Sequence, residues 1–83
     1  MKLKIYSLRD QKTDAFMNPI AMQTTGQLLR MLSDEVNKQD SLVGQHPEDF
    51  ELFEVGEYDT QTGTLTPCPP KSVIVLNELK AKA

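Results

Sequence analysis

The 83-residue chain contains one cysteine and no tryptophan, and it has no long hydrophobic run. A lone cysteine, Cys68, cannot form an internal disulfide, which excludes the small secreted folds held by disulfides and favours a reducing compartment. The longest apolar run covers residues 73–76, whereas a membrane-spanning helix needs about 20 apolar residues. The N-terminus alternates polar and apolar residues from the start and does not resemble a signal peptide. We therefore expect neither a membrane span nor secretion.

Charge of neither sign dominates the total, but its distribution is uneven. Twelve acids against nine lysines and arginines give a net charge of −3. Residues 34–59 carry −8, whereas residues 1–33 carry +3 and residues 60–83 carry +2. These charges either solvate the surface or, if the two terminal segments lie side by side, form one positive patch on an acidic protein.

The pattern of the chain predicts an α+β fold in a single domain over residues 1–83, with a polar tail at about 78–83. Strands are predicted at 3–9, 50–58, 64–66 and 71–77 from their alternating or β-branched residues. One amphipathic helix is predicted at about 25–38, with Thr24 as its N-cap. The result is a mostly antiparallel sheet of about four strands with one helix, in the order β-α-β-β-β.

The connections between these elements are also readable. Residues 16–22 are apolar but interrupted by Asn18-Pro19, which predicts an extended, packed loop. Gly63 is expected to supply the positive φ of a hairpin loop after Asp59. Residues 67–70 contain three prolines and cannot continue a central strand, so they form a stiff connector or a sheet edge.

Several strands are apolar on both faces, which one helix of about four turns cannot cover. The first strand, for example, has Leu3 and Ile5 on one face and Tyr6 and Leu8 on the other. Either the loop at 16–22 covers the second face, or a bulge switches the alternation, or a second copy of the chain packs there. Of these we favour a homodimer.

No residue pattern predicts catalysis. The single histidine, His46, has neither a second histidine nor a cysteine pair with which to bind zinc, and Cys68 has no neighbouring base. The acids lack the spacing of a calcium loop, and the four glycines form no phosphate-binding motif. We therefore expect a protein that is not an enzyme and has no metal or cofactor.

Nucleic-acid binding would need bases to neutralise phosphates and aromatic rings to stack on bases. The candidates lie in and just after the first strand: Lys2, Lys4, Tyr6, Arg9 and Lys12. Period-two alternation places the first three on one face, and Lys71, Lys80 and Lys82 could extend the patch. The alternative is that a lysine-rich strand merely protects a sheet edge from unwanted pairing.

Three stretches together resemble one family: residues 1–10, residues 16–19, and above all the run PEDFELFEVGEYD at 47–59 followed by Thr62-Gly63. Their order is similar to the small non-structural protein of gokushovirus-type microviruses, which are bacteriophages with single-stranded DNA genomes. The resemblance implies a role in the host cytoplasm, in which the protein binds DNA or assists single-stranded genome synthesis and packaging. The best-matched residues, such as Gly56 and Tyr58, look structural, so the resemblance implies a role and not a site.

Two functions follow as hypotheses. In the first, a small dimer binds single-stranded DNA through the basic first strand. In the second, the acidic segment docks on a basic partner, the phage replication initiator or a host replication factor. The residues that would carry this docking are Glu48, Asp49, Glu51, Glu54 and Glu57.

Overall fold

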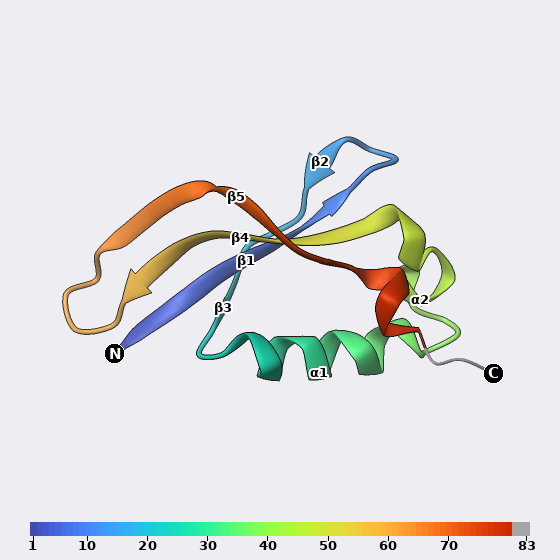
Figure 1. The fold of residues 1–83 in the computed structure, drawn as a ribbon, viewed down its shortest axis with the longest axis horizontal. Helices are drawn as coiled ribbons and strands as arrows, with labels where there is room; N and C mark the ends of the chain where they lie inside the picture. The colour runs from blue at the N-terminus through green and yellow to red at the C-terminus, as the bar shows by residue number, and fades with distance from the viewer. Residues whose placement is uncertain (81–83) are drawn as a thin grey trace.

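Antiparallel strand pairing organises the molecule. The computed structural model describes residues 1–80. Its elements, in chain order, are β1 (Lys2–Asp10), β2 (Ala15–Phe16), β3 (Ile20–Met22), α1 (Thr25–Val36), α2 (Leu42–Gln45), a 3-10 turn η1 (Pro47–Asp49), β4 (Phe50–Asp59), β5 (Leu65–Val75) and a 3-10 turn η2 (Leu76–Leu79). The strands form one antiparallel sheet in the order β2-β1-β4-β5, with β3 also paired to β1. The predicted α+β class, with one main helix, is confirmed (Figure 1).

Three details of the predicted strands are wrong. Residues 16–22 are not only a packed loop, because β2 and β3 pair with β1 on either side of Asn18-Pro19. The strands predicted at 64–66 and 71–77 are one strand, β5, which runs through the prolines. β5 lies at the edge of the sheet and needs N–H donors on one side only, so prolines are tolerated there. Beyond Val75 the chain turns into η2, so the observed strand ends two residues before the predicted end at residue 77.

The helix α1 matches its prediction closely. The Thr24 hydroxyl oxygen accepts a hydrogen bond from the Gln27 backbone N–H at 3.2 Å, and Asn37 follows the last helical residue. Leu28, Leu32 and Val36 recur every four residues and are buried, as expected for a helix with one apolar face. The short helix α2, capped by Ser41, was not predicted.

The hydrophobic core lies between α1 and one face of the sheet. The sheet contributes Tyr6, Leu8, Phe50 and Leu52, and Leu76 of η2 closes one end. We call this sheet face the inner face. Its register continues toward the chain start, where Lys4 lies opposite Glu57 and Lys2 opposite Asp59. A bulge in β4 at Val55 keeps these residues on the inner face, because the pairing shifts by one residue between Ile5 and Tyr6.

The C-terminal turn is tied to the end of α1 by polar contacts. The Lys80 ammonium donates hydrogen bonds to the carbonyl oxygens of Val36 and Gly44, each at 3.2 Å. Gly44 itself sits so close to the preceding loop that a Cβ atom would lie 2.0 Å from the Lys38 carbonyl oxygen. Lys80, predicted to belong to a fraying tail, is thus anchored, whereas residues 81–83 of that tail lie outside the described residues.

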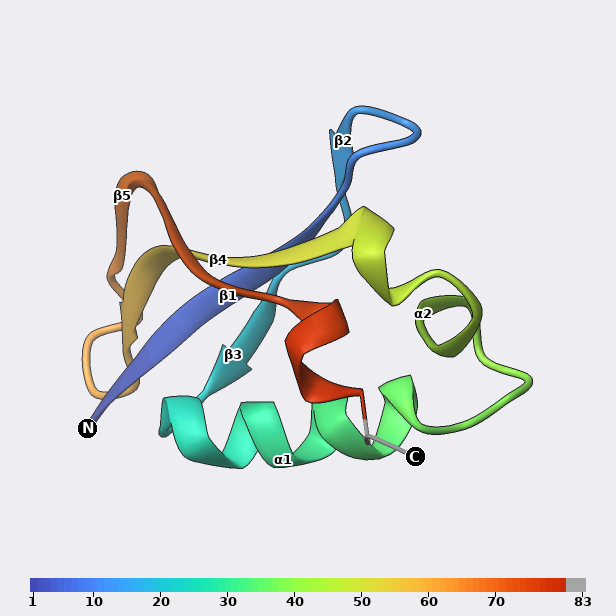
Figure 2. The same ribbon diagram turned by 45° about the vertical axis from the view of Figure 1, so that its right-hand side comes forward.

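The sheet extends further than the helix that covers it. The molecule measures 44 × 25 × 18 Å, and Figures 1 and 2 show the N-terminus and the β4–β5 hairpin projecting past the first turn of α1. We call this projection the arm: residues 2–5 of β1 together with residues 54–71. Its loop contains Gly63 with φ +74°, as predicted.

Candidate functional site: the charged arm

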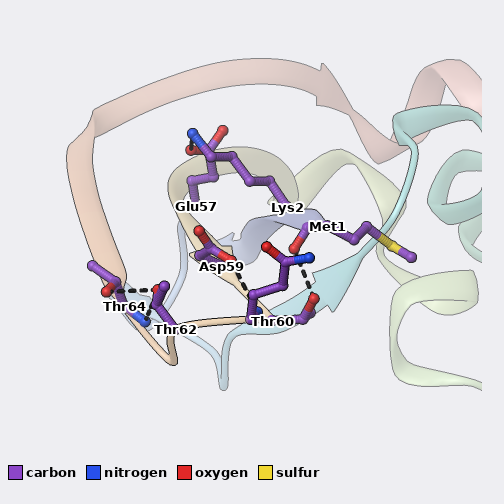
Figure 3. Close-up of polar contacts among 8 residues, drawn as sticks. Met1, Lys2, Glu57, Asp59, Thr60, Thr62 and Thr64 are labelled. Atoms are coloured by element: carbon purple, nitrogen blue, oxygen red, sulfur yellow. Dashed lines mark hydrogen bonds and ion pairs between the residues drawn. The ribbon is translucent and has the colours of Figure 1, made fainter.

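The tip of the arm is held together by main-chain and side-chain hydrogen bonds. The Thr60 N–H and the Thr60 hydroxyl both donate to the Met1 carbonyl oxygen, at 2.9 and 2.8 Å. The Thr62 and Thr64 hydroxyl groups are hydrogen-bonded to each other across the hairpin loop (Figure 3). These bonds fix the start of β1 beside the hairpin and so position the first two lysines.

The arm carries alternating charges on its inner face. The Lys2 ammonium lies 3.5 Å from the Glu57 carboxylate, and Figure 3 shows the two side chains pointing toward each other. The Lys4 ammonium lies 3.8 Å from the Glu54 carboxylate. Lys71 of β5 is the register partner of Glu54. Members of two predicted sites, one basic and one acidic, therefore interleave on the three neighbouring strands β1, β4 and β5.

Asp59, at the end of β4, is a further acid of the arm. The backbone N–H of Gln61 donates to its carboxylate at 2.9 Å. This hydrogen bond, joined by one from Thr62 and by the nearby N-terminal amine and Lys2, lowers the pKa of Asp59 below its ordinary value of 3.8, against a smaller opposing effect of desolvation. Asp59 is therefore ionised over the whole neutral range.

Tyr6 does not belong to the arm surface. Its side chain is 0% exposed and lies in the core, and its hydroxyl is hydrogen-bonded to the Thr25 hydroxyl at the start of α1. The alternation placed it correctly on the face of Lys2 and Lys4, but α1 covers that face from Tyr6 onward. The prediction that Tyr6 contacts nucleic acid is corrected: its ring cannot stack on a base.

The other predicted bases are dispersed. Arg9 forms an ion pair with Asp14 next to the turn after β1, and Lys12 lies in that turn. Lys80 is held at the end of α1, far from the arm tip to which Met1 is bonded. Of the bases in the C-terminal segment, Lys71 lies on the arm with Lys2 and Lys4, whereas Lys80 does not extend that patch. Lys82 lies outside the described residues.

The predicted acidic docking residues also separate into groups. Glu54 and Glu57 pair with lysines of the arm, and Glu51 accepts a hydrogen bond from the Ser72 hydroxyl. Glu48 and Asp49 instead line a surface cavity of about 510 Å³. The remaining residues that line it are Asp10, Lys12, Leu42, His46 and Phe50.

The predicted docking residues did not include Asp10. Asp10 is the register partner of Phe50, and the Gln11 N–H donates to the Asp49 carbonyl oxygen, so strand pairing brings residues 10 and 49 together. One potential ligand atom from each of His46, Glu48 and Asp49 lies within 4.8 Å of the others. These are the residues best placed to hold a cation in the described chain, but two of the three are exposed and exposed acids commonly cluster without an ion.

The fold and its surface define a small α+β protein with a charged projecting arm. A family model described as Phage ORF5 protein matches residues 3–80, so the chain belongs to this family of phage proteins. No curated protein and no solved structure matches the chain significantly. Among the described residues no helix is long and apolar enough to cross a membrane.

Proposed function

We propose that the protein is a non-catalytic accessory factor of a gokushovirus-type microvirus, acting in the host cytoplasm in single-stranded DNA synthesis or packaging, and that its arm contacts the DNA. Membership of a phage family supports the viral origin. The resemblance of residues 47–63 to the non-structural protein of these phages supports the role. The observation that carries the DNA contact is the position of three lysines on the arm: Lys2 and Lys4 lie on β1 and Lys71 lies on β5, the two strands that flank β4.

The lysines of the arm are available although two of them are paired. The side chains of Lys2 and Lys4 are 65% and 50% exposed, and their ion-pair distances are 3.5 and 3.8 Å. Exposed pairs of this kind contribute about 0–1 kcal/mol, so a phosphate can replace a glutamate as the partner at little cost. The glutamates remain next to the bound strand and repel it, which limits the affinity.

A titration of fluorescently labelled single-stranded DNA at two salt concentrations tests this contact. Lys2→Gln combined with Lys4→Gln is expected to weaken binding and to make the salt dependence shallower. Each phosphate contact on single strands contributes about 0.7 to the slope of log K against log [salt], so loss of two contacts reduces the slope by about 1.4. Glu54→Gln combined with Glu57→Gln is expected to tighten binding, because it removes the repulsion.

Lys38→Gln is the matched control. Lys38 is 59% exposed and pairs with Glu35 at 3.1 Å, so it is equally charged and equally paired, but it follows α1 and lies off the arm. Absence of DNA binding by the wild-type protein at low salt would exclude the proposal. If Lys38→Gln and the Lys2→Gln, Lys4→Gln variant lost the same amount of DNA affinity, the effect would be one of total charge, and the arm would be excluded as the binding site.

A second candidate function rests on a separate observation, the cavity lined by Asp10, Glu48 and Asp49. No ion pair involves these three carboxylates in the described part of the chain, so they are available to a basic partner such as the replication initiator of the phage or a host replication factor. Binding of purified initiator should fall when Glu48→Gln and Asp49→Asn are combined and should persist in Glu35→Gln. Binding that is insensitive to the cavity variant would exclude this candidate.

A further inference from the structure

The face of the sheet opposite α1 is apolar along the arm, and we call it the outer face. Register places Leu3, Tyr58 and Leu65 in one row across three strands. Ile5, Gly56 and Pro67 form the next row. Because side chains alternate along a strand, these rows point away from the face that carries Lys2 and Lys4.

Residues 1–80 cover this face only in part. Phe16 of β2 contacts the Phe53 ring edge-on, with centroids 5.5 Å apart, and the aromatic pair borders the apolar rows. Phe16 remains 45% exposed and Leu65 64% exposed, whereas Leu3, Ile5 and Tyr58 between them are half-buried; none of these residues belongs to the hydrophobic core. A partly exposed apolar surface of this kind marks an interaction site.

We propose that the outer face binds a second copy of this chain, forming a two-fold dimer in which the two sheets pack face to face. In a two-fold contact each row meets the same surface on its partner, so apolar rows bury apolar rows. Packed sheets lie about 10 Å apart, a spacing that Leu, Tyr and Phe side chains from both copies fill.

Charge on the outer face favours a second copy over a charged partner. Its charged residues lie at the end away from the arm tip: Arg9 is paired with Asp14, and Glu51 accepts a hydrogen bond from Ser72. The serine hydroxyl leaves the Glu51 carboxylate negatively charged, so these groups amount to one ion pair and one acid, which disfavours a nucleic acid. On a second copy the same face brings mainly apolar rows, with the ion pair and the acid at the end away from the arm tip.

Edge chemistry agrees with face-to-face association. Pairing through the β5 edge is disfavoured, because Pro67, Pro69 and Pro70 have no N–H to donate. The proposal does not depend on whether the arm binds DNA.

Light scattering coupled to size-exclusion chromatography, with sedimentation equilibrium, tests the dimer. The wild-type protein is expected at twice the chain mass of 9.4 kDa. Leu65→Glu and Phe16→Glu place a carboxylate in the contact and are expected to reduce the mass to that of one chain. The matched control is Met31→Glu, which changes a 56% exposed side chain on α1 and should leave the dimer intact.

A wild-type mass of one chain at high micromolar concentration would overturn the proposal. So would a dimer that survives both outer-face changes, or one that Met31→Glu dissociates. Circular dichroism confirms that each variant is folded. If an outer-face variant unfolds, methyl NMR of the wild-type protein decides: signals of Leu3, Ile5 and Leu65 shift on dilution if the proposal is correct, and their invariance refutes it.

Discussion

Replacing Tyr6 by Phe removes a single buried hydroxyl and distinguishes a core role from a DNA-binding role. The ring stays in place because Phe has the same shape, and the residue is 0% exposed. What is lost is the hydrogen bond to the Thr25 hydroxyl, which joins β1 to the first turn of α1. Thr25 is half-buried, so its hydroxyl can turn to water when the partner is gone.

The expected cost follows from these contacts. A hydrogen bond between neutral groups contributes about 1 kcal/mol to the free energy of unfolding. Because the partner regains water and no cavity forms, we expect no further penalty. In a domain of this size, a loss of 1 kcal/mol lowers the melting temperature by about 4–8 °C. DNA affinity should be unchanged, since the ring is inaccessible.

Urea unfolding followed by circular dichroism measures this free energy, and a double-mutant cycle with Thr25→Ala isolates the pair. The coupling energy should equal most of the Tyr6→Phe loss. Full stability of Tyr6→Phe together with a loss of DNA affinity would refute the reasoning and restore Tyr6 as a surface residue. A coupling energy of zero would show that the hydroxyl has another partner.

Three further substitutions test other parts of the structure. Gly44→Ala forces a Cβ atom to 2.0 Å from the Lys38 carbonyl oxygen and should lower the free energy of unfolding by about 1–3 kcal/mol. Gly26→Ala places its Cβ atom where nothing lies within 4 Å and should stabilise α1 by about 0.5–1 kcal/mol. Thermal melts compare the two variants, and equal effects on stability would contradict the close approach at Gly44. Lys80→Met removes the two hydrogen bonds to the carbonyl oxygens of Val36 and Gly44 and should speed amide hydrogen exchange at the end of α1 but not in the arm. Exchange rates that rise equally in both regions, or in neither, would contradict the anchoring of Lys80. Asp59 has a lowered pKa in the folded state, so its stabilising effect is complete above the unfolded-state pKa and disappears as the pH falls through the folded-state pKa. Urea unfolding at a series of acidic pH values should therefore show a shallower decline of the unfolding free energy for Asp59→Asn than for the wild type. Parallel curves of unfolding free energy against pH would contradict the shift.

Local features of the chain were predictable because they depend on neighbouring residues. Thr24 and the apolar spacing from Leu28 to Val36 specify the start and buried face of α1. Gly63 specifies the hairpin loop by its positive φ. The long strands β1 and β4 follow from their alternating apolar residues. These signals need only a few consecutive residues, so they are readable without a fold.

Features that depend on pairing between distant segments were not predictable. Asp10 meets Asp49 because β1 and β4 are antiparallel neighbours, and Lys4 meets Glu54 for the same reason. For the prolines at 67–70 the sequence left two alternatives, a stiff connector or a sheet edge, and only the pairing of β4 with β5 shows that the sheet edge is correct. Tyr6 looked like a surface ring because alternation gives its face but not the point at which a helix begins to cover that face.

The sequence by itself determined the fold class, the helix, the hairpin loop and the resemblance to a phage protein, because each is encoded in a short run of residues. The tertiary structure decided which charges are paired, which aromatic ring is buried and which sheet face is left open. Those properties depend on register and on the length of one helix relative to the sheet, and α1 is too short to cover the arm. The open face and the charged arm, where the proposed interactions lie, are consequences of that difference in length.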